Sequence, residues 1–198
     1  AEETTQETSA EAKTVEPLPS YIDLDNLGDC TVAVSFEKSD LTEENGTYQL
    51  HVTVSDYEKF DMVDISTLQA GDTLVIDGNQ VKVGTLERTD SGAVKINGEI
   101  EDGGIYLWTD NDGVYYEMGF DDYKSYYEVG EITLPLSADF VFTDNSDLDN
   151  PGQTYTAEEF KSYLLIRRDY VPFIRTTVIL SSLVARLQQL IRNILLNR

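Results

Sequence analysis

The chain contains one cysteine and one histidine among its 198 residues. Cys30 on its own cannot form a disulfide within the chain or a metal site of several cysteines. With one His and one Cys, a four-ligand zinc site would also need carboxylates. Cys30 and His51 could serve as a nucleophile and its base. They fall in what the pattern predicts to be neighbouring strands, which favours a buried thiol and an exposed histidine.

Long apolar runs and catalytic motifs are also missing. No stretch approaches the roughly 18 apolar residues that cross a bilayer. The sequence also lacks the basic start and apolar run of a signal peptide. If the chain is exported, we expect the leader to have been removed by processing. The sequence has no phosphate-binding glycine loop, no Gly-x-Ser-x-Gly elbow and no His-Glu-x-x-His. We therefore predict that the protein is not an enzyme, with a glycosidase that uses only carboxylates as the alternative.

Basic residues are scarce in the first 160 positions, which hold 36 of the 37 acids and seven of the 14 Lys and Arg. A net charge of −23 disfavours nucleic acid as a partner, because phosphate binding needs clustered cations. The same charge disfavours anionic membranes as a partner of this part. From Lys161 onward the balance reverses, with seven basic residues and one acid. A basic end after an acidic body suggests that the end docks onto the body or binds a partner.

Residues 1–19 consist mainly of Thr, Glu, Ala and Ser and offer almost nothing to bury. Such a segment is predicted to be a disordered acidic tether. It resembles the tether that follows the processed end of secreted proteins and lipoproteins in Gram-positive bacteria. The resemblance is one of composition and points to no single family. It implies an extracellular or cell-surface location, with membrane contact only through a removed N-terminal anchor or the basic tail.

Residues 20–143 carry the period-two pattern of β-strands. Apolar residues alternate with polar ones over 31–36 and 48–54, two strands that we expect to form a hairpin with 40–44 as a longer connection. From 68 to 118, short apolar runs alternate with Gly-, Asp- and Asn-rich turns, with no helical pattern between them. The sequence predicts a mainly β domain, an antiparallel sandwich or a small barrel.

One late helix is predicted within residues 144–172, after an acidic loop. Thr156 and Glu159 have the spacing of a capping box, in which each side chain accepts a hydrogen bond from a free backbone N–H group. Apolar residues follow at helical spacing, and Pro172 ends the segment.

The acidic loop partly matches a calcium-binding loop. Asp147, Asp149 and Glu158 occupy positions 1, 3 and 12 of that pattern, and Gly152 occupies position 6. Position 5 is Pro151, which has no side-chain oxygen. An Asx-rich turn that matches by chance is the alternative. Ca²⁺ is therefore the only cofactor that the sequence suggests.

The tail, residues 173–198, reads as a strand over 176–180 followed by an amphipathic helix from Ser182. The alternatives for its apolar stripe are the acidic body of the chain, a membrane surface, or a second copy of the chain in a homo-oligomer. A frameshifted or foreign end is a fourth interpretation. In the homo-oligomer, the seam would be formed by Leu183, Leu187, Leu190 and Ile194.

Six of the 12 tyrosines, with Trp108 and Phe120, lie between Tyr106 and Tyr127. A turn centred on residues 111 and 112 would divide the surrounding side chains between two faces. The core face would hold Ile105, Leu107, Val114, Tyr116 and Met118. The other face would hold Tyr106, Trp108, Tyr115 and Glu117, which is how a platform for stacking sugar rings would look. The alternative is that the late helix or the tail covers this aromatic face as a second core layer.

These patterns predict a non-catalytic extracellular binding or adaptor domain, with a glycan or a surface protein as its partner. The alternative is a structural assembly protein that oligomerises through its C-terminal tail.

Overall fold

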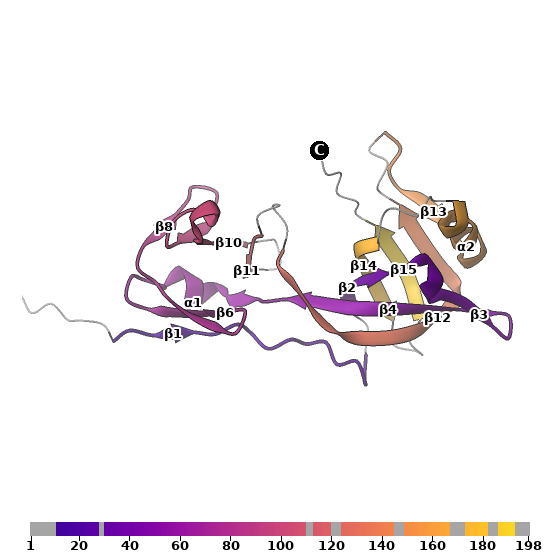
Figure 1. Ribbon diagram of the computed structural model, residues 1–198, viewed down its shortest axis with the longest axis horizontal. Helices are drawn as coiled ribbons and strands as arrows, with labels where there is room; N and C mark the ends of the chain where they lie inside the picture. Colours follow the sequence, from indigo (N-terminus) through magenta and orange to yellow (C-terminus); the bar gives the residue numbers. More distant parts are fainter. Residues whose placement is uncertain are drawn as a thin grey trace, which may run out of the picture. The chain divides into compact units, whose positions relative to one another are not determined.

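The computed structural model describes residues 11–27, 30–109, 113–119, 124–144, 149–166, 173–181 and 186–192, the last two ranges as backbone only (Figure 1). The chain divides into two compact units. Unit 1 comprises Ala1–Ser20 and Tyr57–Ser125, and unit 2 comprises Tyr21–Asp56 and Tyr126–Arg198. The sequence predicted one domain over 20–143, whereas the structure divides these residues between two units.

Unit 1 contains two small sheets. The first has the strand order β1-β6-β7 and the second β5-β11-β10-β9-β8. The elements are β1 (Thr14–Val15), β5 (Phe60–Asp61), α1 (Met62–Ser66), β6 (Thr73–Ile76), β7 (Asn79–Lys82), β8 (Leu86–Arg88), β9 (Val94–Ile96), the 3₁₀ turn η2 (Ile100–Asp102), β10 (Ile105–Thr109) and β11 (Val114–Glu117).

The core of unit 1 is mainly aliphatic. Alternate residues of its short strands point inward, including Leu74 on β6, Ile96 on β9 and Leu107 on β10, all with no exposed surface. Asp77 and Gly78 both have positive φ angles, of 48° and 71°. They form the two-residue turn between β6 and β7, as the Asp-Gly pair predicts.

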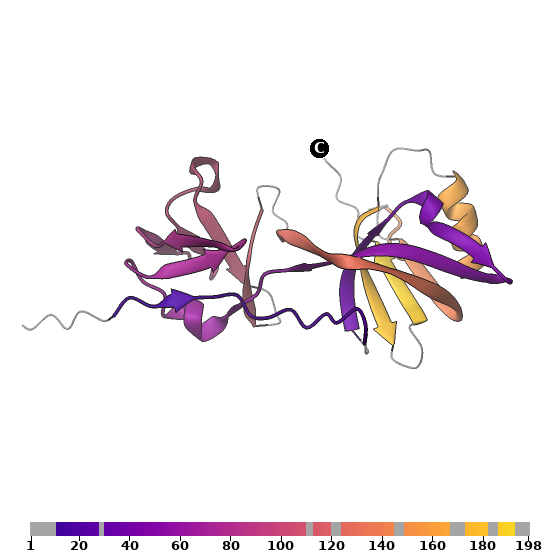
Figure 2. The same ribbon diagram turned by 60° about the horizontal axis from the view of Figure 1, so that its bottom comes forward.

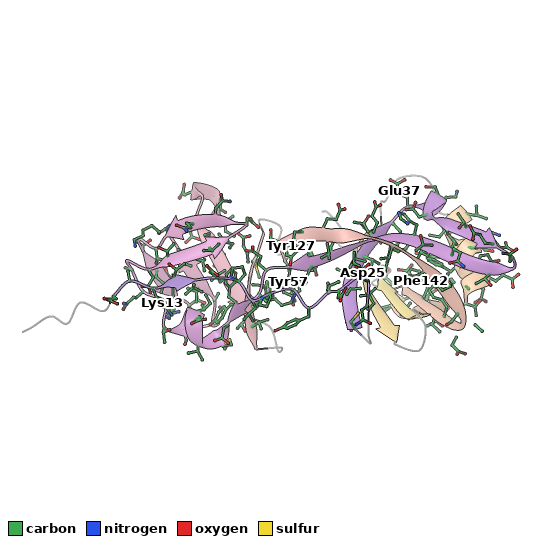
Figure 3. All side chains as sticks on the ribbon, turned by 90° about the horizontal axis from the view of Figure 1, so that it is seen from below. Lys13, Asp25, Glu37, Tyr57, Tyr127 and Phe142 are labelled. Atoms are coloured by element: carbon green, nitrogen blue, oxygen red, sulfur yellow. The ribbon has the colours of Figure 1, made fainter. Side chains whose placement is uncertain are left out.

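The N-terminal segment is not a free tether at residues 13–18, so that prediction was wrong there. Thr14–Val15 pairs in parallel with Thr73–Leu74, and Val15 is 2% exposed. Lys13 is labelled in Figure 3. Its backbone N–H donates to the Asp72 carboxylate over 2.9 Å, and its ammonium group donates to the Asp64 carbonyl of α1 over 2.8 Å. Two isolated apolar residues, Val15 and Leu18, were too weak a sequence signal. Residues 1–10 lie outside the described part.

Unit 2 is built on one sheet of strand order β13-β12-β15-β14-β2-β4-β3, in which β4 also pairs with β12. Its elements are β2 (Cys30–Phe36), the 3₁₀ turn η1 (Lys38–Asp40), β3 (Leu41–Glu44), β4 (Thr47–Tyr57), β12 (Tyr126–Asp144), β13 (Gln153–Tyr155), α2 (Ala157–Ile166), β14 (Phe173–Ser181) and β15 (Arg186–Arg192). β4 ends on Tyr57, the first residue of the inserted part of unit 1.

The alternation predicted for β2 and β4 is confirmed. Val32, Val34 and Phe36 of β2 are buried, as are Leu50, Val52 and Val54 of β4, and the two strands pair antiparallel. The expected connection over 40–44 is largely a strand. β3 pairs with β4 across the two-residue Asn45-Gly46 turn, so this Asn-Gly signal marks a tighter hairpin than the one predicted.

The late helix is confirmed as α2. The Glu159 carboxylate accepts the Thr156 N–H over 2.9 Å, and the Thr156 hydroxyl accepts the Glu159 N–H over 3.4 Å. This capping box lowers the pKa of Glu159 through the hydrogen bonds from Thr156. The helix then buries Phe160 and Leu164 against β12.

The C-terminal tail differs from its prediction. β14 confirms the expected strand, but β15 occupies 186–192, where the periodicity predicted a helix, so that prediction was wrong for these residues. β15 pairs with β14 on one side and with β12 on the other (Figure 2). The backbone groups of β15 therefore form hydrogen bonds within the sheet on both sides. Helical spacing of leucines cannot reveal pairing with β12, a strand that is distant in sequence. Residues 182–185 and 193–198 lie outside the described part.

The fold is mainly β and its strands pair mainly antiparallel, as predicted; among the described strands, β1–β6 and β12–β15 are parallel pairs. The described strands form three sheets rather than a closed barrel. None of the described helices is long and apolar enough to cross a membrane.

Candidate functional site

The register between β10 and β11 decides which aromatic side chains share a face. Trp108 pairs with Tyr116, and Leu107 pairs with Glu117. The Met118 N–H donates to the Tyr106 carbonyl over 2.9 Å. Residues directly opposite each other in an antiparallel pair lie on the same side of the sheet. One side therefore presents Tyr106, Trp108, Tyr116 and Met118, which we call the outer face.

Tyr115 and Glu117 do not belong to the outer face, so the predicted grouping of these residues with Tyr106 and Trp108 was wrong. The observed pairing is displaced by one residue from the one that a turn centred on 111 and 112 would give. Because side chains alternate with a period of two, this displacement moves every residue of β11 to the opposite side.

Tyr115 is part of the core of unit 1. It is 7% exposed, and its hydroxyl donates to the Gly92 carbonyl over 3.0 Å. A buried tyrosine normally finds such a partner for its hydroxyl. The role of Tyr115 is therefore structural.

Glu117 lies half-buried near two other carboxylates. Burial raises the pKa of Glu117, and the charges of Asp77 and Glu58 raise it further, while a hydrogen bond with Ser125 opposes them. Burial also raises the pKa of Glu58, whose carboxylate accepts the Asp77 N–H over 3.0 Å. In the part of the chain that the structure describes, no three His, Cys, Asp or Glu side chains are arranged to hold a metal ion.

The outer face continues across β9 and β8. Lys95 pairs with Tyr106 on one side and with Glu87 on the other, so one row runs from Glu87 through Lys95 and Tyr106 to Met118. Trp108 stands two residues further along β10. Charged and aromatic side chains from four strands thus gather on one side of the sheet.

An open cavity of about 420 Å³ lies on this face. The rings of Tyr106 and Trp108 are half-buried and nearly parallel, with 14° between their planes and 6.3 Å between their centroids. Aromatic rings that are partly exposed beside a cavity present flat apolar surfaces to a ligand. The described residues that line the cavity are Lys95, Glu99, Ile100, Glu101, Tyr106, Trp108 and Met118.

A tight loop between β9 and β10 carries the acidic wall of the cavity. Glu99 precedes η2, and Glu101 lies within it. Gly103 closes the turn with a φ of 83°, and a Cβ on Gly104 would lie 2.3 Å from the Gly98 carbonyl oxygen. Glycine is therefore required at Gly104 for the loop to close this tightly. The sequence marks this turn by Asp102-Gly-Gly but gives no sign that its acids face the aromatic rings.

Lys95 forms a salt bridge with Glu99 of this loop. Its ammonium group donates to both carboxylate oxygens of Glu99, over 2.7 and 2.9 Å, and lies 5.6 Å from the centroid of the Tyr106 ring. The hydrogen bond with Glu99 raises the pKa of Lys95, so Lys95 stays protonated. Sequence reasoning missed Lys95, Glu99 and Glu101.

The β11 side of the outer face is covered. The Tyr57 ring lies edge-on to Tyr116, with 5.8 Å between centroids, and Lys124 lies 4.5 Å from the Tyr116 centroid. Tyr116 is accordingly only 8% exposed. The open part of the face is therefore the part that holds Tyr106 and Trp108.

The predicted calcium site stays a prediction, because one of its three acidic ligands lies outside the described part of the chain. Asp149 is exposed, Glu158 lies exposed in the first turn of α2, and Asp147 is outside the described residues.

Two of the four predicted assembly residues, Leu187 and Leu190, are paired within the sheet of unit 2 through β15. A helical seam at these positions would need a helix, and the backbone there is a strand. Leu183 and Ile194 lie outside the described part.

Cys30 and His51 do not form a nucleophile–base pair. His51 contacts β12, with 3.1 Å from Nδ1 to the Thr133 hydroxyl and 3.5 Å from Nε2 to the Glu131 carboxylate. The register of β2 and β4 pairs Val34 with Val54, which separates Cys30 and His51 by seven residues along the sheet, about 20 Å.

Comparison of the chain with protein-family models, with curated proteins and with solved structures gives no match.

Proposed function

We propose that this protein is a non-catalytic extracellular binding or adaptor domain that holds a glycan on the outer face of unit 1. The observation that carries the proposal is the nearly parallel pair of Tyr106 and Trp108 rings beside the open cavity. The cavity of about 420 Å³ has the size that small-molecule sites usually have.

The chemistry of the cavity suits a sugar. The C–H side of a pyranose ring packs on a flat aromatic surface, and Tyr106 and Trp108 supply two such surfaces from one strand. The carboxylates of Glu99 and Glu101 stand beside them as acceptors for sugar hydroxyl groups. Apolar stacking combined with a few placed polar groups is the usual composition of a ligand site.

An extracellular or cell-surface location is part of this proposal. Its support is compositional: a single cysteine, a strongly acidic balance and a Thr-, Glu- and Ala-rich start. A polysaccharide partner outside the cell fits that location.

The first experiment is retention of the protein on insoluble polysaccharides such as cellulose, chitin and bacterial cell-wall glycan. Trp108 is the only tryptophan of the chain, so its fluorescence reports binding of the matching soluble oligosaccharides at this face alone. We expect retention on at least one polysaccharide and a saturable fluorescence change with its oligosaccharides.

Two variants and one control locate the site. Trp108→Ala and Tyr106→Ala each remove one ring and should weaken retention at least tenfold, because stacking on an aromatic ring is worth on the order of 1–3 kcal/mol. Tyr21→Ala removes a ring of unit 2 that is 77% exposed and should leave retention unchanged. Equal retention of all three variants and the unaltered protein would show that glycans bind elsewhere.

A further inference from the structure

The charges around the cavity are unbalanced. Lys95 is the one cation among the described residues that line it, and Glu99 and Glu101 are the two anions. Two more carboxylates stand close by. Glu87 pairs with Lys95 across the strands and Asp102 follows Glu101 in η2.

Lys95 is already neutralised, which leaves no cation among the described lining residues for an anionic ligand. Its ammonium group donates two hydrogen bonds to the Glu99 carboxylate, and its side chain is 21% exposed. An anionic sugar would have to displace Glu99 from this pair and would leave another carboxylate unpaired. Uronic acids and sulfated or phosphorylated glycans are therefore disfavoured.

Glu101 carries the uncompensated charge. It is exposed at the rim, on the loop that faces Tyr106 and Trp108, and no described residue forms an ion pair or a hydrogen bond with its carboxylate. The chain as a whole carries −23, so the surrounding field also favours cations.

We propose that the ligand of the outer face is a glycan with free amino groups, such as a polymer of glucosamine that lacks N-acetyl groups. This inference rests on the proposed function. One sugar ring stacks on Tyr106 or Trp108, and its protonated amino group pairs with the Glu101 carboxylate. The pair lies at the rim, so its contribution is modest and is screened by salt.

The test compares three tetrasaccharides by titration of Trp108 fluorescence at mildly acidic pH, where the amino groups are protonated. They are the β-1,4-linked tetramer of glucosamine, its N-acetylated counterpart, and a tetramer of galacturonic acid. We expect the glucosamine tetramer to bind about fivefold or more tightly than the N-acetylated one, and the galacturonic tetramer most weakly. The preference should shrink as salt is added.

Two controls separate recognition of the amino sugar from general attraction between opposite charges. Tetralysine has the same charge as the glucosamine tetramer but no sugar ring, and it should leave the Trp108 signal nearly unchanged. Glu101→Gln should reduce the preference for the amino sugar by about three- to fivefold. The matched variant Glu16→Gln changes an exposed carboxylate of the N-terminal segment of unit 1 and should keep the preference.

Each outcome has a separate meaning. Equal binding of the glucosamine and N-acetylated tetramers, or a preference that survives Glu101→Gln, overturns the amino-sugar inference and leaves the glycan proposal standing. Tetralysine that binds as tightly as the glucosamine tetramer and changes the Trp108 signal equally also overturns it. If no oligosaccharide or polysaccharide binds at all, the proposed function itself fails.

Discussion

The two units use aromatic side chains in different ways. The core of unit 2 contains a cluster of aromatic rings around Phe142, which is labelled in Figure 3. Phe142 contacts Phe160 and Tyr163 with centroid distances of 4.7 and 5.2 Å. Unit 1 has a mainly aliphatic core, into which only Phe60 and Tyr115 contribute rings among the described residues. Its Tyr106 and Trp108 instead stand half-buried on the outer face.

Buried rings stabilise the fold, whereas half-exposed rings contribute less to its stability and can contact a ligand. A buried aromatic side chain contributes several kcal/mol through apolar burial, and a half-exposed one forgoes part of that contribution. Unit 2 also leaves Tyr21 and Tyr127 exposed, at 77% and 40%, so exposure alone does not assign a role to a ring. Tyr106 and Trp108 differ from these two tyrosines in lining the cavity, and the proposed function rests on that difference.

The largest change in stability is expected for Phe160→Ala. Phe160 is fully buried and contacts Phe36, Phe140 and Phe142. Removing the ring leaves a cavity, and we expect the free energy of unfolding of unit 2 to fall by about 3–5 kcal/mol. Hydrogen exchange of the β2 and β12 amides, measured against urea, checks this. A loss below about 1 kcal/mol would mean that the cluster is not the core of unit 2.

Tyr163→Phe tests how α2 is fastened to the sheet. The Tyr163 hydroxyl donates a short hydrogen bond to the buried Asp144 carboxylate. Without it the carboxylate loses one of its donors, and we expect a destabilisation of about 1–2 kcal/mol in chemical denaturation. An unchanged stability would show that water replaces the hydroxyl at this position.

A pair of hydroxyl deletions in unit 1 tests the register of β10 and β11. Tyr115→Phe should cost about 1 kcal/mol, because the buried hydroxyl donates to the Gly92 carbonyl. Tyr106→Phe should change the free energy of unfolding by less than about 0.5 kcal/mol, because Tyr106 lies on the open face. The reverse order would place Tyr115 outside and Tyr106 inside.

The smallest expected effect concerns Glu117. Because burial raises its folded-state pKa above the ordinary value of 4.5, the folded state holds the proton more tightly than the unfolded state. Protonated Glu117 therefore makes its full contribution to the stability of the folded state below the ordinary pKa. This contribution is lost as pH rises through the folded-state pKa. Glu117→Gln should therefore raise the free energy of unfolding at neutral pH, by less than about 1 kcal/mol because the group is partly exposed. It should also reduce the change in this free energy between mildly acidic and neutral pH.

The control for Glu117→Gln is Glu128→Gln, which changes an exposed carboxylate of unit 2. Denaturation of both variants at two pH values, followed by Trp108 fluorescence, gives the comparison. The predicted pH dependence would be contradicted if the free energy of unfolding of the unaltered protein rose from mildly acidic to neutral pH and Glu117→Gln removed that rise.

Local patterns predicted much of the secondary structure. The alternation in β2 and β4 and the capping box of α2 each depend on neighbouring residues, and each was predicted correctly. The division into two units depends on contacts between distant segments, such as Val15 with Leu74, and no local pattern contains them.

The candidate site was predicted in part, and for a specific reason. Tyr106 and Trp108 were placed on one face because they lie two apart on a strand. Tyr115 and Glu117 were misplaced because the centre of the turn was assumed. Moving that centre by half a residue changes the pairing by one residue and places every side chain of β11 on the opposite face. Lys95, Glu99 and Glu101 come from the preceding strand and loop, which only the register of β9 and β10 brings beside the rings.

The proposed function requires Trp108 to stand on an open ligand face rather than in a second core layer. The most direct test is quenching of its fluorescence by acrylamide, with and without a saturating glycan tetramer. An open face predicts efficient quenching of the free protein and clear protection by the tetramer that binds. Weak quenching of the free protein would contradict the claim, because the indole would then be covered by the chain itself.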